Sequence, residues 1–185
     1  MKISIFGLGY VGAVSSACFA RLGHQVIGVD SDRAKVDLIN QGKSPIIEKC
    51  LNAIISEQRR LGRIAATDKA EDAIQATELS LICVGTPSTA NGHLDLGSIF
   101  KVAHEIGAAI KKKKDFHTIA IRSTVLPGTN DRVAELIMMT SGKINGKDFS
   151  VVSNPEFLRE GSAVEDFFRL HSRLSEPEPT IGVKM

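Results

Sequence analysis

The chemistry that this sequence suggests most directly is carried by three glycines and an aspartate near its start. Gly7, Gly9 and Gly12 stand in the run GLGYVG, directly after the apolar run KISIF. In that spacing the first glycine allows a tight turn, the second lets a phosphate approach the backbone, and the third lets the next helix pack closely. Asp30 ends a second apolar run about 20 residues further on, where a carboxylate accepts hydrogen bonds from ribose hydroxyls. The pattern predicts a dinucleotide site with the pyrophosphate at a helix N-terminus.

The carboxylate of Asp30 also favours NAD over NADP. A 2′-phosphate beside it would be repelled by about 1 kcal/mol in water and by about 4 kcal/mol at an effective dielectric constant of roughly 20. Arg33 offers a positive charge that offsets part of this repulsion. Glycine turns also occur for steric reasons alone, so a purely structural turn is the alternative interpretation.

Two threonines and two glutamates are the other candidates for chemistry. Thr86 follows the apolar run LSLICV, and Thr124 follows HTIAIR. Ligands of an open parallel sheet bind beyond the carboxyl ends of its strands, which places Thr86 near the cofactor, although it also fits an ordinary Gly-Thr-Pro turn. Glu156 and Glu160 stand in NPEFLRE. A carboxylate within reach can accept a proton from water, but from the residues alone either glutamate can equally be a solvated loop acid or a helix-capping partner.

The three cysteines have no spacing that would bind a metal, so we expect no metal site. Cys18 falls in a predicted helix and Cys83 in a predicted strand, where cysteine behaves as a small hydrophobic residue. Cys50 has no neighbouring histidine that would activate its thiol. All three are expected to be reduced and structural.

These candidates need a frame of alternating strands and helices. Apolar runs predict strands at 2–6, 25–30, 64–67, 79–84, 117–122 and 149–152, with helices from the glycine loop onwards and at 31–40, 48–61, 68–77, 95–110 and 129–140. Ser31 and Asp68 are the expected caps of two of these helices. The alternation predicts an α/β fold, a Rossmann-like doubly wound parallel sheet with helices on both faces and the first strand central. The four lysines at 111–114 are expected on a solvated helix end.

Composition limits the classes of protein that fit. The chain has 185 residues, of which 43% are hydrophobic and 24% charged, and its formal net charge is +2. This composition is typical of a soluble globular protein, and the charge is too small to indicate binding to nucleic acid or to an anionic membrane. The sequence shows neither a membrane-spanning run nor a signal-peptide pattern, so the cytoplasm is the default location. We expect a cofactor-binding domain at 1–168 and a poorly ordered tail at 169–185.

Taken together, the motifs resemble a known family. The segments that carry the resemblance are ISIFGLGYVG, GVD, LINQGKSPIIE, ICVGTPS, RSTVLPGT and SNPEFLREGSAVEDF. They are similar to the N-terminal part of the nucleotide-sugar 6-dehydrogenases of polysaccharide biosynthesis, which act on UDP-glucose or GDP-mannose. RSTVLPGT, and GTPS followed by NGHLDL, are more similar to the GDP-mannose branch. The resemblance implies a four-electron oxidation of a sugar alcohol to a carboxylate by two NAD molecules, through a thioester on a cysteine.

The resemblance also assigns roles to individual residues. It implies that the NAD site includes the glycine loop, Asp30, a lysine near the ribose and two threonines at the nicotinamide: Gly7, Gly9, Tyr10, Val11, Gly12, Asp30, Lys35, Thr86 and Thr124. Thr124, Glu156 and Glu160 match groups that the family uses in catalysis. Glu156, Phe157, Leu158 and Glu160 match its contacts to the sugar nucleotide.

The sequence also departs from the family. The nucleophilic cysteine of the family lies in a downstream glycine-rich motif that this chain lacks, and the family's usual EPGL is EKCL at 48–51. The residues after AVEDFF are unrelated to the family, as in a truncated or frameshifted product or an added tail. The helical linker through which members pair is absent, so that route to a dimer is lost. We therefore expect an NAD-binding fragment that does not complete turnover. The alternatives are a UDP-glucose dehydrogenase fragment and a non-catalytic module that binds NAD or docks on a partner.

Overall fold

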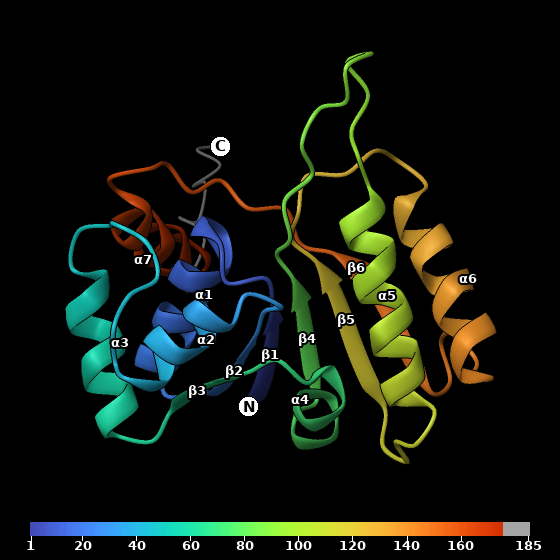
Figure 1. Cartoon of the computed structure of the whole chain (residues 1–185), viewed down its shortest axis with the longest axis horizontal. Coiled ribbons are helices and arrows are strands. Elements are labelled where there is room, and N and C mark those ends of the chain that lie inside the picture. The colour runs from blue at the N-terminus through green and yellow to red at the C-terminus, as the bar shows by residue number, and fades with distance from the viewer. Residues whose placement is uncertain (176–185) are drawn as a thin grey trace, which may run out of the picture.

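The computed structural model describes residues 1–175, and within this part six parallel strands form one sheet in the order β3-β2-β1-β4-β5-β6 (Figure 1). The strands are β1 (Lys2–Phe6), β2 (Gln25–Val29), β3 (Ile64–Thr67), β4 (Leu79–Ile82), β5 (His117–Ile121) and β6 (Phe149–Ser153). The predicted α/β fold is therefore confirmed, with the first strand between β2 and β4. Four of the five residues of β1 are buried, as expected for a strand that is covered on both faces.

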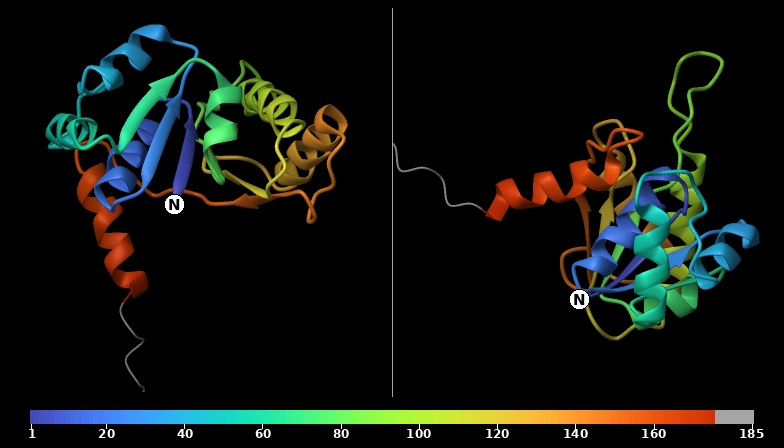
Figure 2. Two further views of the ribbon diagram at one scale, coloured as in Figure 1. Left: turned by 90° about the horizontal axis from the view of Figure 1, so that it is seen from below. Right: turned by 90° about the vertical axis from the view of Figure 1, so that its left-hand side faces the viewer.

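Helices cover both faces of this sheet (Figure 2). They are α1 (Tyr10–Arg21), α2 (Arg33–Asn40), α3 (Leu51–Arg60), α4 (Ala70–Ala76), α5 (Gly97–Ile110), α6 (Thr129–Ser141) and α7 (Ala163–Ser175). Apolar side chains of α1, α3 and α7 form one core layer with the sheet, and those of α4, α5 and α6 form the other. This two-layer packing leaves the carboxyl ends of β1, β4 and β5 at one edge, where their loops meet.

Two of the predicted helix caps are wrong. The helix after β2 is capped by Asp32, whose Oδ1 accepts a hydrogen bond from the backbone N–H of Ala34, and not by Ser31. Helix α4 begins at Ala70 without a side-chain cap, and the carboxylate of Asp68 instead forms an ion pair with Arg33.

The lysine run and the end of the chain also differ from the prediction. Lys113 is buried, and its Nζ donates hydrogen bonds to the carbonyl oxygens of Ile74 and Thr77, at 2.7 and 2.6 Å. Helix α7 was not predicted, and it continues to Ser175, past the expected domain boundary at Phe168. The remainder of the predicted tail, 176–185, lies outside the described residues.

The turn that carries the departure from EPGL is built around a strained residue. Cys50 has a φ of 63°, in the left-handed region, at the start of α3. This conformation costs a residue with a Cβ about 1–2 kcal/mol and costs glycine almost nothing. Replacing Cys50 with glycine should therefore raise the free energy of unfolding by about 1 kcal/mol in urea denaturation, after the entropy that glycine adds to the unfolded chain. Cys50→Ala, which keeps the Cβ, should show no such gain. Equal stability of the two variants would contradict this explanation.

Candidate functional site

The loop between β1 and α1 has the shape that its three glycines predict. Gly7 has a φ of 95°, and its N–H donates to the carbonyl oxygen of Val29 at 2.7 Å. A Cβ on Gly12 would lie 1.7 Å from the carbonyl oxygen of Gly7, so no larger residue fits there. A Cβ on Gly9 would meet no atom within 4 Å. The loop is therefore tightly packed against the helix at Gly12, and it leaves free space at Gly9, on the side where a ligand would approach.

The first turn of α1 is suited to an anion. Gly9 is its N-cap, so no side chain accepts a hydrogen bond from the first N–H groups of the helix, and the first turn contains no acidic residue. The positive end of the helix dipole and these N–H groups face the open side of the loop. A phosphate can occupy this position without displacing any protein group.

Asp30 is held rigidly at the end of β2. Its Oδ2 accepts the N–H of Leu8 at 2.7 Å, its Oδ1 accepts the N–H of Asp32 at 2.8 Å, and Lys35 Nζ lies 3.6 Å from Oδ2. Each carboxylate oxygen keeps a second lone pair for a ribose hydroxyl. The carboxylate borders a pocket of about 190 Å³ between the strand ends and α5, which Gly7, Ser98 and Lys101 also line. The carboxylate of Asp30 is thus fixed directly beside the glycine loop.

A second pocket, of about 280 Å³, opens on the other side of the glycine loop. Its walls come from three places: the loop, the carboxyl ends of β4 and β5, and the segment after β6. The lining residues are Gly9, Tyr10, Val11, Cys83, Val84, Gly85, Thr86, Arg122, Ser123, Thr124 and Glu156. The hydroxyl of Thr86 donates to the carbonyl oxygen of Thr124 at 3.1 Å. The structure therefore brings six predicted site residues together here: Gly9, Tyr10, Val11, Thr86, Thr124 and Glu156.

The remaining predicted residues lie apart from this pocket. Glu160 is exposed and outside its lining, and Phe157 is 73% exposed. Leu158 is partly buried and packs against the core layer that contains α1. The carboxylate of Glu156 accepts a hydrogen bond from the N–H of Leu158, which shapes this segment as a turn.

Three lining residues with polar or sulfur-containing side chains, Ser123, Arg122 and Cys83, were not predicted as site residues from the sequence. Ser123 donates through its hydroxyl to the carbonyl oxygen of Val84 at 2.6 Å, which ties the loop after β5 to the loop after β4. Arg122 donates to Asn154 Oδ1 at 2.7 Å and so holds the segment after β6. Both directly follow β5, so the rule that ligands bind at the carboxyl ends of strands could have found them. Cys83, the third, also follows its strand.

The buried cysteines do not have the properties of nucleophiles. Burial raises the pKa of Cys83 to about 12, and it raises the pKa of Cys18 to about 12 as well. Both thiols are therefore protonated at neutral pH, whereas the reactive form of cysteine is the thiolate. All three cysteines are free of disulfides, as predicted.

Comparisons with known proteins agree with this geometry. Residues 1–174 match the profile of the UDP-glucose/GDP-mannose dehydrogenase family, NAD binding domain. The chain belongs to this family. The predicted family and the predicted cofactor, NAD, are confirmed.

Similar proteins from bacteria and archaea show how far the likeness extends. The GDP-mannose 6-dehydrogenase of Pseudomonas aeruginosa is 55% identical over 168 residues, which are 90% of this chain and 38% of that protein. The UDP-glucose 6-dehydrogenase of Rhizobium meliloti is 42% identical over 170 residues, 91% of this chain and 38% of that protein. The chain thus spans well under half the length of these relatives.

Solved structures give the same result for the fold. A ternary complex of GDP-mannose dehydrogenase from Pseudomonas aeruginosa superposes with a TM-score of 0.89 at 54% identity, covering 90% of this chain and 38% of that one. For a UDP-glucose dehydrogenase from Pyrobaculum islandicum the TM-score is 0.84 at 41% identity, over 90% of this chain and 38% of that one. Within the described residues, no helix is long and apolar enough to cross a membrane. The same residues contain no group of three or more metal-binding side chains.

Proposed function

We propose that this chain supplies the NAD-binding part of an enzyme that oxidises the primary alcohol of GDP-mannose to a carboxylate. The observation that carries the proposal is the pocket beside the glycine loop, in which open space at Gly9 adjoins Thr124 and Glu156. GDP-mannose is favoured over UDP-glucose because the relative that acts on GDP-mannose is 55% identical, against 42% for the one that acts on UDP-glucose. The cytoplasmic location stays a prediction, as does the loss of the family's route to a dimer.

The two pockets accommodate different parts of the NAD molecule. The N–H groups of the first turn of α1 hold the pyrophosphate, and Asp30, with Lys35 beside it, holds the ribose of the adenosine half. Thr86 and Thr124 line the space for the nicotinamide. Bound NAD supplies the acceptor for a hydride from the alcohol carbon.

The segment after β6 provides the acid–base and substrate groups. The hydroxyl of Thr124 can hold a water molecule, and the carboxylate of Glu156 can accept a proton from it. We assign Glu160 and the backbone of Phe157 and Leu158 to the sugar nucleotide. These residues come directly after Glu156 in the sequence, so a substrate bound at Glu156 lies close to them.

None of the three cysteines fits the covalent step that the family uses. Cys18 and Cys83 are buried and protonated, and Cys50 lies directly before α3, outside the lining of the pocket that holds Thr124. We therefore expect the purified chain to bind NAD and to produce no NADH from GDP-mannose or UDP-glucose. Absorbance at the NADH band measures this directly. Steady NADH production would contradict the assignment of the cysteines.

Removing the carboxylate of Asp30 should weaken NAD binding about 10- to 100-fold, because one or two charge-assisted hydrogen bonds to the ribose are lost. Calorimetric titration of Asp30→Ala with NAD measures the change. Asp37→Ala is the matched control, since it removes one exposed carboxylate from α2 and should bind NAD like the unchanged protein. Equal affinity of both variants would overturn the assignment of Asp30.

A further inference from the structure

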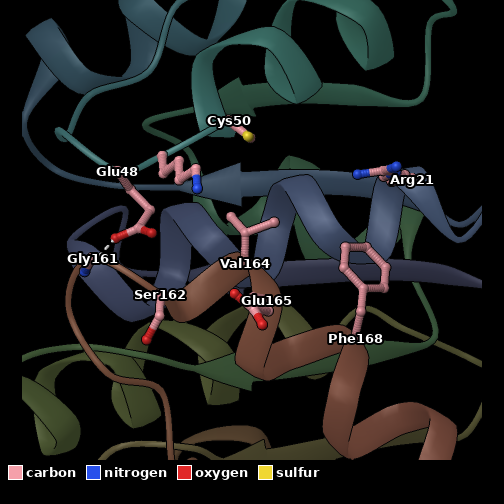
Figure 3. Close-up of a pocket in the computed structure, with 9 residues that line it drawn as sticks. Arg21, Glu48, Cys50, Gly161, Ser162, Val164, Glu165 and Phe168 are labelled. Carbon is pink, nitrogen blue, oxygen red and sulfur yellow. Dashed lines mark hydrogen bonds between the residues drawn. The ribbon is translucent and has the colours of Figure 1, made fainter.

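Three segments far apart in the sequence meet at the hydroxyl of Tyr10. This hydroxyl donates to Glu48 Oε2 and accepts the N–H of Gly161 at 3.0 Å. The N–H of Gly161 also lies 2.8 Å from Glu48 Oε2, and Figure 3 shows the Glu48 side chain directed at Gly161. We call these three residues the Tyr10 clasp. It joins the glycine loop, the turn before α3 and the segment that follows Glu156.

The clasp lies between the cofactor site and a second pocket. Tyr10 is the first residue of α1, so its backbone belongs to the turn that faces the open side of the glycine loop, and the residue lines the pocket of Thr124. Glu48 and Gly161 line a neighbouring pocket of about 320 Å³ between α1 and α7 (Figure 3). The clasp therefore separates the cofactor side of the loop from the α7 side.

The chain beyond the clasp is fixed as one unit. The side chain of Arg159 pairs with Asp166 in α7 at 2.7 Å, and the backbone N–H of Arg159 donates to the same carboxylate. This partner holds the pKa of Asp166 well below its usual range. The carbonyl oxygen of Arg159 lies 3.3 Å from the Tyr10 hydroxyl. A shift at Tyr10 is therefore passed to the whole turn that begins at Glu156.

The hydroxyl of Tyr10 has one proton and two acceptors within reach, Glu48 and the carbonyl oxygen of Arg159. Burial and the Glu48 carboxylate raise the pKa of Tyr10 to about 12, so the proton stays in place at neutral pH. The Glu48 Oε1 atom is buried and has no hydrogen-bond partner in the structure. The carboxylate therefore makes its hydrogen bonds in the clasp through Oε2 alone.

We propose that Tyr10 is a positioning residue: through Glu48 and Gly161 its hydroxyl couples dinucleotide binding at the glycine loop to the placement of the segment 154–162. This inference rests on the proposed function of that segment. Dinucleotide binding fixes the first turn of α1, and the clasp transmits that order to the turn that carries Glu156.

Hydrogen–deuterium exchange of the full chain, with and without NAD, tests the coupling. In the unchanged protein NAD should slow exchange both in the glycine loop and in 154–162. Tyr10→Phe keeps the ring and the backbone N–H, and Glu48→Gln keeps the shape of the side chain. In both variants NAD should still protect the glycine loop but should no longer protect 154–162, whose exchange without NAD should be about tenfold faster. Glu71→Gln, at an exposed glutamate of α4, is the control and should behave like the unchanged protein.

The outcomes separate the inference from the function on which it rests. NAD protection of 154–162 that persists in Tyr10→Phe, or that is absent in the unchanged protein while the glycine loop is protected, would overturn the coupling. A purely structural clasp would give faster exchange without NAD and leave the protection by NAD intact, which also overturns it. Absence of protection at the glycine loop in the unchanged protein would contradict the cofactor site itself.

Discussion

Replacing Gly12 with alanine should abolish NAD binding and lower the free energy of unfolding by at least about 3 kcal/mol. The added Cβ would lie 1.7 Å from the carbonyl oxygen of Gly7, and this oxygen belongs to the backbone of the turn itself. No side-chain rotation relieves such an overlap, so either α1 moves away from the sheet or the turn opens. Urea denaturation measures the loss of stability, and a calorimetric titration should show NAD binding weakened by more than about 100-fold.

Gly9→Ala is the matched variant, since it adds the same methyl group three residues earlier. Gly9 has a φ of −72°, which alanine adopts freely, and its Cβ would meet no protein atom within 4 Å. Its stability should change by no more than about 0.5 kcal/mol, whereas NAD affinity should fall by about tenfold or more because the methyl occupies the approach of the pyrophosphate. Unchanged NAD affinity in Gly9→Ala would show that the dinucleotide does not pass over this loop.

The parts of the fold and site that could be predicted are those whose signals lie within one short segment. Gly7, Gly12 and Asp30 all fall inside the first βαβ unit, where local turn chemistry and hydrophobic runs determine the geometry. Thr86 could be placed because it lies shortly after the buried strand β4, and parallel strands bring their carboxyl ends together. The role of Thr124 depends on the resemblance to the family. The parallel arrangement of the strands then brings these separately predicted residues together in one pocket.

The caps show a limit of local reasoning. Ser31 and Asp32 are both good N-cap residues, and the pattern does not separate them. The choice is made by Asp30, whose Oδ1 accepts the N–H of Asp32 and so fixes the backbone that places the Asp32 side chain over Ala34. A residue of the site thereby sets the start of the next helix.

The Tyr10 clasp and the burial of Lys113 depend on long-range contacts that no window of sequence contains. Tyr10 and Gly161 are 151 positions apart. Lys113 stands in a run of four lysines, and it is buried because the C-terminal end of α4 presents two carbonyl oxygens to its ammonium group. Its three neighbours in the run are exposed. Identical residue types therefore take different roles according to which acceptors the tertiary structure supplies.

His117 should make the stability of the protein fall as the pH is lowered from 7 towards 4. It is fully buried at the start of β5, and its Nε2 lies 2.7 Å from the hydroxyl of Ser80. That hydroxyl is 2.7 Å from the hydroxyl of Ser4 in β1. The Nδ1 atom of His117 is buried and has no hydrogen-bond partner in the structure. The side chain is thus part of a buried polar network of Ser4, Ser80 and His117 inside the sheet.

Burial, and then the positive charge of Lys113, lower the pKa of His117 to about 4. The unfolded chain has a histidine pKa of about 6.5, so between these two values the unfolded state binds more protons than the folded state. Stability contributed by neutral His117 is complete above the unfolded pKa and is lost as the pH falls towards the folded pKa. The loss should reach about 1.5 kcal/mol at pH 5.5 and about 3 kcal/mol at pH 4.

The variant His117→Gln isolates this contribution, because its amide can still bond to Ser80 and does not titrate. Urea denaturation between pH 7 and 5 should give a sloping free energy of unfolding for the unchanged protein and a nearly flat one for the variant. His104→Gln, at an exposed position of α5, should keep the slope. A slope between pH 7 and 5 that survives in His117→Gln would contradict the assignment of the pH dependence to His117. Carboxylates such as Asp166 protonate mainly below pH 5, so the window from 7 to 5 separates their titration from that of His117.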